Sequence, residues 1–340
     1  MSGGFEITKE SGVAVAKDGK KLVLDPHGKR ECAVVSHGHM DHLVGGALMT
    51  PHTKDVLKIR KGEEDALTLD VGGRKNYGGM EVEFFHSGHV LGSVMVLVED
   101  SVLYTGDFNV EGGFMSPPPS TDFDVDVLVM EATYGDPRFV FPPKKDVVED
   151  IIGWISALSN EGPIAIGAYE FGKAQEVMKI GETAGVDIFV PPPIASISEV
   201  YNRWGADIKY HEVDMDVFES WTGDGLNVDE KSLREEIFRP GSLFVVPTGY
   251  LKKGSGFARL MRRMGGCSAY VSGWCSVYNM RHRYDVDAQF PLSDHSDHRG
   301  LMGFVEDVNP GEVFLVHGST QAKKKLAREI EAMGKSVRII

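Results

Sequence analysis

The sequence has few cysteines and no long apolar run, and both absences limit where the protein can work. Its three cysteines (Cys32, Cys267 and Cys275) lie far apart and include no CxxC pair. Such a set cannot build an even disulfide framework, which favours a reducing cytoplasm. No apolar stretch approaches the roughly 20 residues that cross a bilayer, and residues 1–12 lack the basic and apolar regions of a secretory signal. We therefore expect a cytoplasmic protein with no membrane partner.

Positive charge is also scarce. Lysine and arginine number 36 against 50 aspartates and glutamates, which gives a formal net charge of −14. This balance argues against a protein that coats nucleic acid through its overall field, but it leaves room for a local basic groove or a metal site. The 340 residues suffice for about two domains. We find no internal repeat and no low-complexity segment.

Short apolar segments suggest β-structure first and mixed α/β structure later. Residues 13–25 predict a hairpin around Asp18 and Gly19. Further short strands are expected at 32–36, 82–85, 94–100, 101–107 and 125–131. From residue 145 onward, helical and strand patterns alternate, as in βαβ units on a parallel sheet. Residues 297–340 read as helix, strand, helix and strand.

The stretch "SHGHMDH" at residues 36–42 concentrates three histidines and an aspartate in one turn. A solvent-facing turn with coincidental histidines is the plain alternative, but so dense a group is improbable by chance. Imidazole and carboxylate are the usual ligands of catalytic zinc. Three later positions lie at predicted strand ends and can complete a dinuclear site. The first ion would take His37, His39 and His89, the second would take Asp41, His42 and His317, and Asp107 would bridge them.

Together these motifs resemble the metallo-β-lactamase superfamily: "HGHMDH" (37–42), a later lone histidine, "TGD" (105–107) and a histidine after a terminal strand. The resemblance implies an αββα sandwich with two Zn²⁺ ions at one edge, although Mn²⁺ and Fe²⁺ stay open because such sites accept several metals. Asp25 matches the superfamily's early aspartate, which orients a ligand or its loop. An ordinary turn residue is an equal alternative for Asp25.

Three further stretches resemble the motifs of the β-CASP nucleases within that superfamily: "LVMEATYG" (128–135), "PLSDHSDH" (291–298) and "VHG" (316–318). The resemblance implies an α/β fold in which a Rossmann-like βαβ cap domain interrupts the sandwich. The expected domains are 1–138 and 292–340 for the metallo-β-lactamase domain and 139–291 for the β-CASP cap. The pattern is similar to short archaeal and bacterial exonucleases, including ones associated with DNA ligase.

Phosphodiester hydrolysis requires a nucleophile, charge neutralisation on the phosphate and a proton for the leaving oxygen. Two metal ions can supply hydroxide and neutralise phosphoryl oxygens. The resemblance gives the catalytic roles to Asp41, Glu131 and His295, with Glu131 holding His295 against the scissile phosphate or leaving group. The structural alternatives are a buried turn-capping carboxylate for Glu131 and a helix-capping neighbour for His295.

Polynucleotide contacts are expected in the cap. Lys173 lies near a predicted helix start, where backbone N–H groups favour phosphate, and Arg281 and Arg283 could form a basic wall. Surface positions are expected for the other basic residues, namely Arg259, Arg262, Arg263 and Lys323 to Lys325. Structural roles are expected for His27, His52, His86, His211 and His298, with a site role left open for His298 because it lies close to the site motif.

The sequence thus predicts a zinc-dependent nuclease acting on single-stranded nucleic acid in a cleft between core and cap, with a homodimer as one possible assembly. The resemblance favours RNA processing or decay, by 5′–3′ exonuclease or endonuclease action, because in the β-CASP family a histidine at the position of His317 accompanies RNA processing more often. A ligase-associated DNA exonuclease in repair is the alternative. A thioesterase- or lactonase-type hydrolase is a second one, and it would not need the Glu131–His295 pair.

Overall fold

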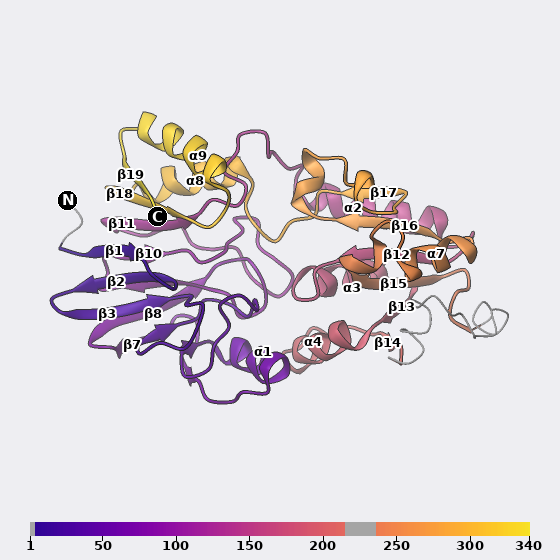
Figure 1. Cartoon of the computed structure of the whole chain (residues 1–340), viewed down its shortest axis with the longest axis horizontal. Helices are drawn as coiled ribbons and strands as arrows, with labels where there is room; N and C mark the ends of the chain where they lie inside the picture. Colours follow the sequence, from indigo (N-terminus) through magenta and orange to yellow (C-terminus); the bar gives the residue numbers. More distant parts are fainter. Residues whose placement is uncertain (1–3, 215–235) are drawn as a thin grey trace. The chain divides into compact units, whose positions relative to one another are not determined.

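The computed structural model describes residues 4–214 and 236–340, and their contacts divide the chain into two compact units. The first unit contains Met1–Val140 and Asp294–Ile340, and the second contains Phe141–Ser293. The chain therefore leaves the first unit once and returns to it (Figure 1). This is the course expected when one domain is inserted into another.

The first sheet of the first unit has the order β1-β2-β3-β4-β5-β6. Its strands are β1 (Glu6–Lys9), β2 (Val13–Lys17), β3 (Lys20–Leu24), β4 (Ala33–Val34), β5 (Leu48–Met49) and β6 (Leu67–Thr68). The predicted hairpin is confirmed, because β2 and β3 pair antiparallel with Lys17 opposite Lys20. Asp18 and Gly19 form its turn with φ of 50° and 76°, which is the left-handed geometry that a two-residue hairpin turn requires.

The second sheet has the order β19-β18-β11-β10-β9-β8-β7 and combines parallel with antiparallel pairs. Its strands are β7 (Arg74–Tyr77), β8 (Met80–His86), β9 (Val94–Val98), β10 (Val102–Tyr104), β11 (Val127–Glu131), β18 (Glu312–Val316) and β19 (Ser336–Ile339). β11 lies between β10 and β18, and both neighbours run parallel to it. Three chain segments therefore leave the sheet side by side at one edge, where side chains from distant parts of the sequence can meet.

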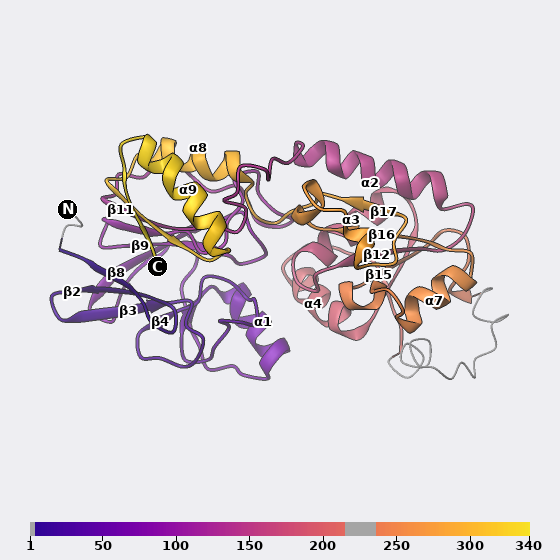
Figure 2. The same ribbon diagram turned by 45° about the horizontal axis from the view of Figure 1, so that its top comes forward.

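The two sheets pack face to face. Leu22 and Leu24 of the first sheet share a buried core with Phe84, Val96 and other residues of the second. The opposite face of the second sheet is covered by α8 (His298–Val308) and α9 (Thr320–Ala332), which lie against each other (Figure 2). One more helix of this unit, α1 (Pro51–Lys61), was not predicted from the sequence.

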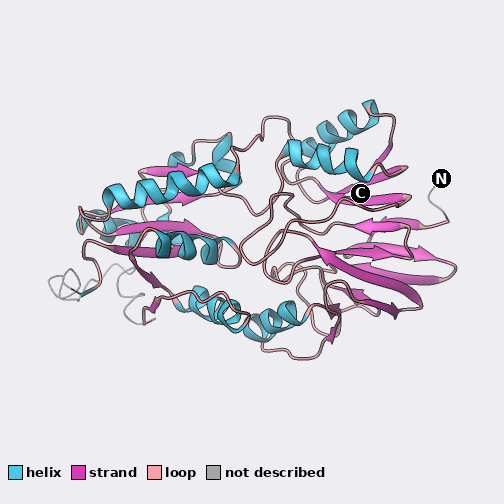
Figure 3. Cartoon of the chain, turned by 180° about the vertical axis from the view of Figure 1, so that it is seen from behind, coloured by secondary structure: helices cyan, strands magenta, loops and turns pink. Residues whose placement is uncertain are grey.

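The second unit is built on a parallel sheet of order β14-β13-β15-β12-β16-β17. Its described strands are β12 (Ile164–Ala168), β13 (Asp187–Val190), β14 (His211–Glu212), β15 (Ser242–Pro247), β16 (Cys267–Val271) and β17 (Ala288–Phe290). Its described helices are α2 (Lys144–Leu158), α3 (Lys173–Thr183), α4 (Pro192–Arg203) and α7 (Gly256–Arg263), with short 3₁₀ turns η1 (Thr248–Leu251), η2 (Gly273–Ser276) and η3 (Met280–His282). Strands and helices alternate along the chain (Figure 3).

The predicted fold class is confirmed: an α/β chain with a two-sheet sandwich and an inserted βαβ unit. The three cysteines form no disulfide. Within residues 4–214 and 236–340, no helix has the length and apolarity needed to cross a membrane.

Candidate metal centre

The polar residues singled out in the first unit follow strand ends. His37, His39, Asp41 and His42 belong to the loop after β4, and His89 follows β8. Asp107 follows β10, Glu131 is the last residue of β11, and His317 follows β18. Glu131 is paired in register with Val316, the residue before His317.

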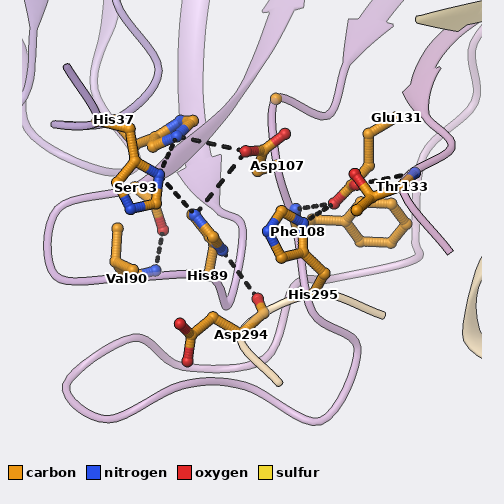
Figure 4. A network of polar contacts seen from close by, with 12 residues as sticks. His37, His89, Val90, Ser93, Asp107, Phe108, Glu131, Thr133, Asp294 and His295 are labelled. Carbon is orange, nitrogen blue, oxygen red and sulfur yellow. Dashed lines mark hydrogen bonds and ion pairs between the residues drawn. The ribbon is translucent and has the colours of Figure 1, made fainter. Parts of the chain in front are cut away.

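Four of these side chains form a compact group. The ligand atoms of His37, His39, His89 and Asp107 all lie within 4.8 Å of one another. His39 Nδ1 is 2.9 Å from His37 Nε2 and 3.3 Å from His89 Nε2. Asp107 Oδ2 is 3.4 Å from His37 Nε2 and 3.9 Å from His89 Nε2 (Figure 4). Zinc–nitrogen bonds of about 2.0–2.1 Å in a tetrahedron would separate two nitrogens by roughly 3.3 Å, so these spacings suit one zinc ion.

A chain of hydrogen bonds fixes the tautomer of His37. The hydroxyl of Ser36 donates its only proton to Asp25 Oδ2 at 2.6 Å. Towards His37 Nδ1, 2.9 Å away, the same oxygen can only accept. His37 therefore carries its proton on Nδ1 and directs the lone pair of Nε2 into the group. Asp25 also accepts from the Ser36 N–H at 2.7 Å and the Tyr104 hydroxyl at 2.8 Å, which holds it behind the ligand.

His89 has the same arrangement. Its Nδ1 donates to the backbone carbonyl of Asp294 at 2.8 Å, so its Nε2 lone pair also points towards His39 Nδ1. The Nε2 lone pairs of His37 and His89 therefore both face His39 Nδ1, and this nitrogen can donate a proton to only one of them. A metal cation would satisfy all three nitrogens.

Electrostatics favour the neutral, metal-binding form of these imidazoles. Burial, followed by the nearby His89, lowers the pKa of His39 to about 3. Burial likewise lowers the pKa of His37 well below its ordinary value and lowers that of His89. All three are therefore neutral at pH 7 without help from a metal.

The residues expected at the second ion are less closely gathered. Asp41 Oδ1 lies 3.2 Å from His42 Nδ1, and His317 Nδ1 lies 2.9 Å from Asp107 Oδ1. Among the described residues, however, the three-residue group of possible metal ligands that contains His42 is completed by Asp25 and His37, and Asp41 and His317 do not belong to it. Asp107 nonetheless presents one oxygen to the first group and the other to His317.

His42 provides the test of whether a second cation fits. Its Nε2 is buried and has no hydrogen-bond partner, and a buried polar atom without a partner is rare. Burial lowers the pKa of His42, but the charges of Asp25 and Asp41 outweigh burial and raise it to about 9. His42 is therefore protonated at neutral pH, with its Nε2 3.9 Å from Asp25 Oδ1. The same carboxylates that hold this proton would favour a metal cation that replaces it.

Glu131 and His295 meet as the sequence motifs predicted. His295 Nδ1 donates to Glu131 Oε1 at 2.8 Å, and the Phe108 N–H donates to the same oxygen at 3.0 Å (Figure 4). Glu131 is 1% exposed, so its carboxylate is fixed by protein groups. Asp107, Glu131 and His295 place ligand atoms within 4.8 Å of one another, which joins this pair to the metal-ligand group.

The remaining candidates belong to the second unit. Lys173 is the first residue of α3 and is almost fully buried, with its Nζ 5.3 Å from the ring centre of Tyr169. Arg281 donates to the backbone carbonyl of Asp287. The guanidinium of Arg283 lies 5.7 Å from the ring centre of Tyr284.

One expectation for the closing helix is wrong. Lys323 is 9% exposed and donates to the carbonyl of Ile340, and Lys325 pairs with the buried Asp136 at 2.8 Å. Both contacts therefore tie the helix to its surroundings. His298 is structural, because its two ring nitrogens contact the Gly135 carbonyl and Glu329.

Sequence reasoning missed Ser36 and Gly106. Ser36 opens the histidine-rich stretch, but only the fold reveals its place between Asp25 and His37. Gly106 has φ of 53°, and a Cβ there would lie 2.6 Å from Ser36 Oγ. The glycine before Asp107 therefore leaves space for the hydroxyl that orients His37.

Comparison with known proteins agrees with this site. A family model described as "Zn-dependent metallo-hydrolase RNA specificity domain" matches residues 283–340. A "Probable DNA ligase" of Opitutus terrae is 30% identical over 325 residues, which cover 90% of this chain and 28% of that protein. An "RNase J-like protein" of Methanocaldococcus jannaschii is 29% identical over 210 residues, or 50% of this chain and 49% of that protein.

The "RNase aCSPSF2" of Saccharolobus solfataricus is 27% identical over 366 residues, covering 88% of this chain and 71% of that protein. The chain spans less than half of the length of the first two relatives. The motifs, the two-sheet sandwich with its inserted unit, and these matches show that the chain belongs to the β-CASP family of metal-dependent nucleases in the metallo-β-lactamase superfamily.

Proposed function

We propose that this protein hydrolyses phosphodiester bonds in single-stranded nucleic acid and that RNA is its main substrate. The observation that carries the proposal is the contact between two groups of residues. The ligand group His37, His39, His89 and Asp107 shares Asp107 with the Glu131–His295 pair. A metal site alone would suit many hydrolases, whereas this second pair supplies the proton transfer that breaking a phosphodiester bond requires.

We assign His37, His39 and His89 to a first zinc ion and Asp41, His42 and His317 to a second, with Asp107 shared. Three findings support this assignment: the nitrogen spacings in the first group, the buried Nε2 of His42 that has no hydrogen-bond partner, and the two carboxylate oxygens of Asp107 that face different histidines. When bound, two such ions lower the pKa of water and neutralise phosphoryl oxygens.

His295 is assigned to move a proton at the leaving oxygen. Because its Nδ1–H is donated to Glu131, Nε2 is the nitrogen that can hold or release a proton. Glu131 fixes the ring and stabilises its cationic form. Burial of Glu131 keeps water from competing for that carboxylate.

The assigned metal ligands also suggest where the catalytic domain lies in the chain. We propose that residues 1–138 and 292–340 form the catalytic metallo-β-lactamase domain, because every assigned ligand lies there, and that 139–291 form the β-CASP cap. Lys173, Arg281 and Arg283 are proposed to contact the substrate backbone from the cap. A reducing cytoplasm is the proposed compartment, in keeping with three unpaired cysteines.

DNA is the second candidate substrate. It is favoured by the similarity to a relative named as a probable DNA ligase, whereas RNA is favoured by two relatives named as RNases and by the RNA-specificity description of the matching model. A ligase-associated exonuclease and an RNA-processing enzyme would use the same metal ligands, so the choice depends on strand recognition.

The deciding experiment supplies zinc-loaded protein with matched single-stranded RNA and DNA, each carrying a 5′-monophosphate or a 5′-hydroxyl. We expect RNA to be degraded faster, with the 5′-phosphate changing the rate if the action is 5′–3′ exonucleolytic. The His39→Ala variant should be inactive. Degradation of DNA alone would move the assignment to repair, and cleavage of neither strand by protein shown to hold two metals would refute the proposed activity.

A further inference from the structure

A cavity of about 380 Å³ is lined only by residues of the second unit. Its walls come from segments that follow the carboxyl ends of three neighbouring parallel strands. Tyr169 follows β12, the turn η1 follows β15, and Trp274 in η2 follows β16. The cavity therefore opens where parallel α/β sheets generally bind ligands.

The strand order explains why a crevice forms there. From β12 the chain passes through α3 to β13 on one side, and from β15 it passes through α7 to β16 on the other. Right-handed crossovers in opposite directions place the two helices on opposite faces of the sheet. The packing agrees, because a Cβ on Gly181 of α3 would contact Leu243, whereas α7 packs with Phe244, the next residue of β15. The segments after β12 and β15 therefore diverge.

Aromatic rings dominate the cavity wall. Tyr169 and Tyr278 are 51% and 43% exposed, which is unusual for such large side chains, and both line this one cavity. The rings of Trp274 and Tyr278 lie 6.1 Å apart at 30°. Tyr270 is stacked on Tyr284, with 4.4 Å between the ring centres and 15° between the ring planes. Flat, exposed rings of this kind suit a flat ligand.

The charge of the cavity is positive. Lys252 and Arg283 line it, and among the described residues none of those lining it carries a carboxylate. The buried Nζ of Lys173 adds a third positive charge next to the Tyr169 ring. In a chain of net charge −14, this is a local reversal of sign. A ligand that is flat and aromatic at one end and anionic at the other matches both properties.

We propose that this cavity, the aromatic pocket, binds single-stranded nucleic acid by stacking a nucleobase on Tyr169 and Tyr278, while Lys252 and Arg283 contact the adjoining phosphates. Proteins that hold single strands without reading their sequence combine stacking platforms and cations in this way. The inference rests on the proposed nuclease function and names where the second unit holds the strand. Every base has a stacking face, so the pocket would accept many sequences.

The test compares binding of two phosphorothioate single strands that resist hydrolysis, one complete and one with abasic sites but the same number of phosphates. Fluorescence anisotropy with zinc-loaded full-length protein gives both affinities. We expect the wild type to prefer the complete strand. Tyr169→Leu and Tyr278→Leu should each weaken its binding by about 10-fold and leave the abasic strand almost unchanged. Lys252→Gln should weaken both strands.

Two controls separate stacking from general damage. Tyr278→Phe keeps the ring and should bind like the wild type. Trp204→Leu removes another ring of the second unit, 38% exposed and outside the pocket, and should have no effect. Unchanged binding of the complete strand by both leucine variants would overturn the proposal.

Cleavage of natural strands by the same preparations separates the two claims. If the wild type cleaves but the leucine variants bind normally, the pocket is wrong and the nuclease assignment stands. If the leucine variants lose binding of the complete strand as expected but the wild type cleaves no strand, the aromatic pocket stands and the nuclease assignment is wrong. Absence of binding to either strand would refute both.

Discussion

The hydroxyl group of Ser36 decides which nitrogen of His37 can bind a metal. Since its proton is committed to Asp25, it can only accept from His37 Nδ1, and Nε2 is left as the ligand atom. Asp25 is a residue to which sequence reasoning gave two equal roles. Three hydrogen bonds hold Asp25 next to Ser36, which in turn contacts His37, and on this geometry we propose the orienting role.

We expect Ser36→Ala to weaken binding of the first zinc ion by about 10- to 100-fold, because His37 loses the acceptor that fixes its tautomer and ring orientation. Competition with a fluorescent zinc chelator measures the affinity. Ser101→Ala is the matched control, since Ser101 hydrogen-bonds the exposed Asp126 outside the site. Equal zinc affinity in both variants would contradict the role of Ser36.

The Glu131–His295 pair has a structural counterpart in Glu329 and His298, which lie 3.0 Å apart. Glu131→Gln keeps an oxygen for the Phe108 N–H but removes the charge that stabilises protonated His295. We expect kcat to fall by about 10²- to 10⁴-fold with zinc content unchanged. Glu329→Gln should leave kcat intact. Loss of zinc from the Glu131→Gln protein, measured by atomic absorption, would show that Glu131 acts through the metal ligands instead.

Among the helices and strands, turn and helix-boundary residues in the sequence predicted local elements well, but they did not predict which distant strands pair. The β2–β3 hairpin has its turn signal in Asp18-Gly19, and α3 begins at Lys173, where a helix start is expected. Helix α1 was missed although Thr50, Pro51 and Gly62 are ordinary boundary signals. The strands β5 and β6, two residues each, carry no periodic pattern and depend on their neighbours.

In the candidate metal centre, too, local sequence signals were predictive and long-range contacts were not. The dense stretch 36–42 and the strand-end motifs gave the first ligand group from sequence alone, because parallel strands bring their ends to one edge. The hydrogen bond from His89 to the Asp294 carbonyl was not predictable, since it joins residues 205 positions apart through a backbone atom.

The loop after β8 supplies an element-scale prediction. Gly88 has φ of 74°, and a Cβ there would lie 2.1 Å from the carbonyl oxygen of Asn109. We expect Gly88→Ala to destabilise the protein by about 1–3 kcal/mol and to displace His89, with loss of zinc. Gly303→Ala, inside α8 with no atom within 4 Å of the new Cβ, should instead stabilise it by about 0.5–1 kcal/mol. Urea unfolding measures both, and equal changes would refute the steric argument.

For the whole molecule, the buried histidines predict how stability depends on pH once metal is removed. The pKa of His39 is lowered to about 3, first by burial and then by His89, whereas an unfolded histidine titrates near 6.5. Between these values the unfolded chain binds more protons, so stability falls as the pH drops below about 6.5. The lowered pKa values of His37 and His89 act in the same direction.

His42 acts in the opposite direction. Its pKa is raised to about 9, because Asp25 and Asp41 outweigh the effect of burial. Its contribution is therefore complete below about 6.5 and is lost as the pH rises through 9. Chelator-treated protein should thus be most stable near neutral pH. Zinc should raise its melting temperature less at pH 5 than at pH 7, because protons compete with metal for the same nitrogens in acid.

Calorimetric melting of chelator-treated and zinc-loaded protein at pH 5, 7 and 9 tests this prediction. His39→Gln should flatten the acid side of the metal-free profile, and His42→Gln the alkaline side. A metal-free protein that melts at the same temperature at pH 5 and pH 7 would mean that these imidazoles are not held neutral by burial. In that case the buried first group would not be preorganised for a metal, and zinc would have to assemble the site as it binds.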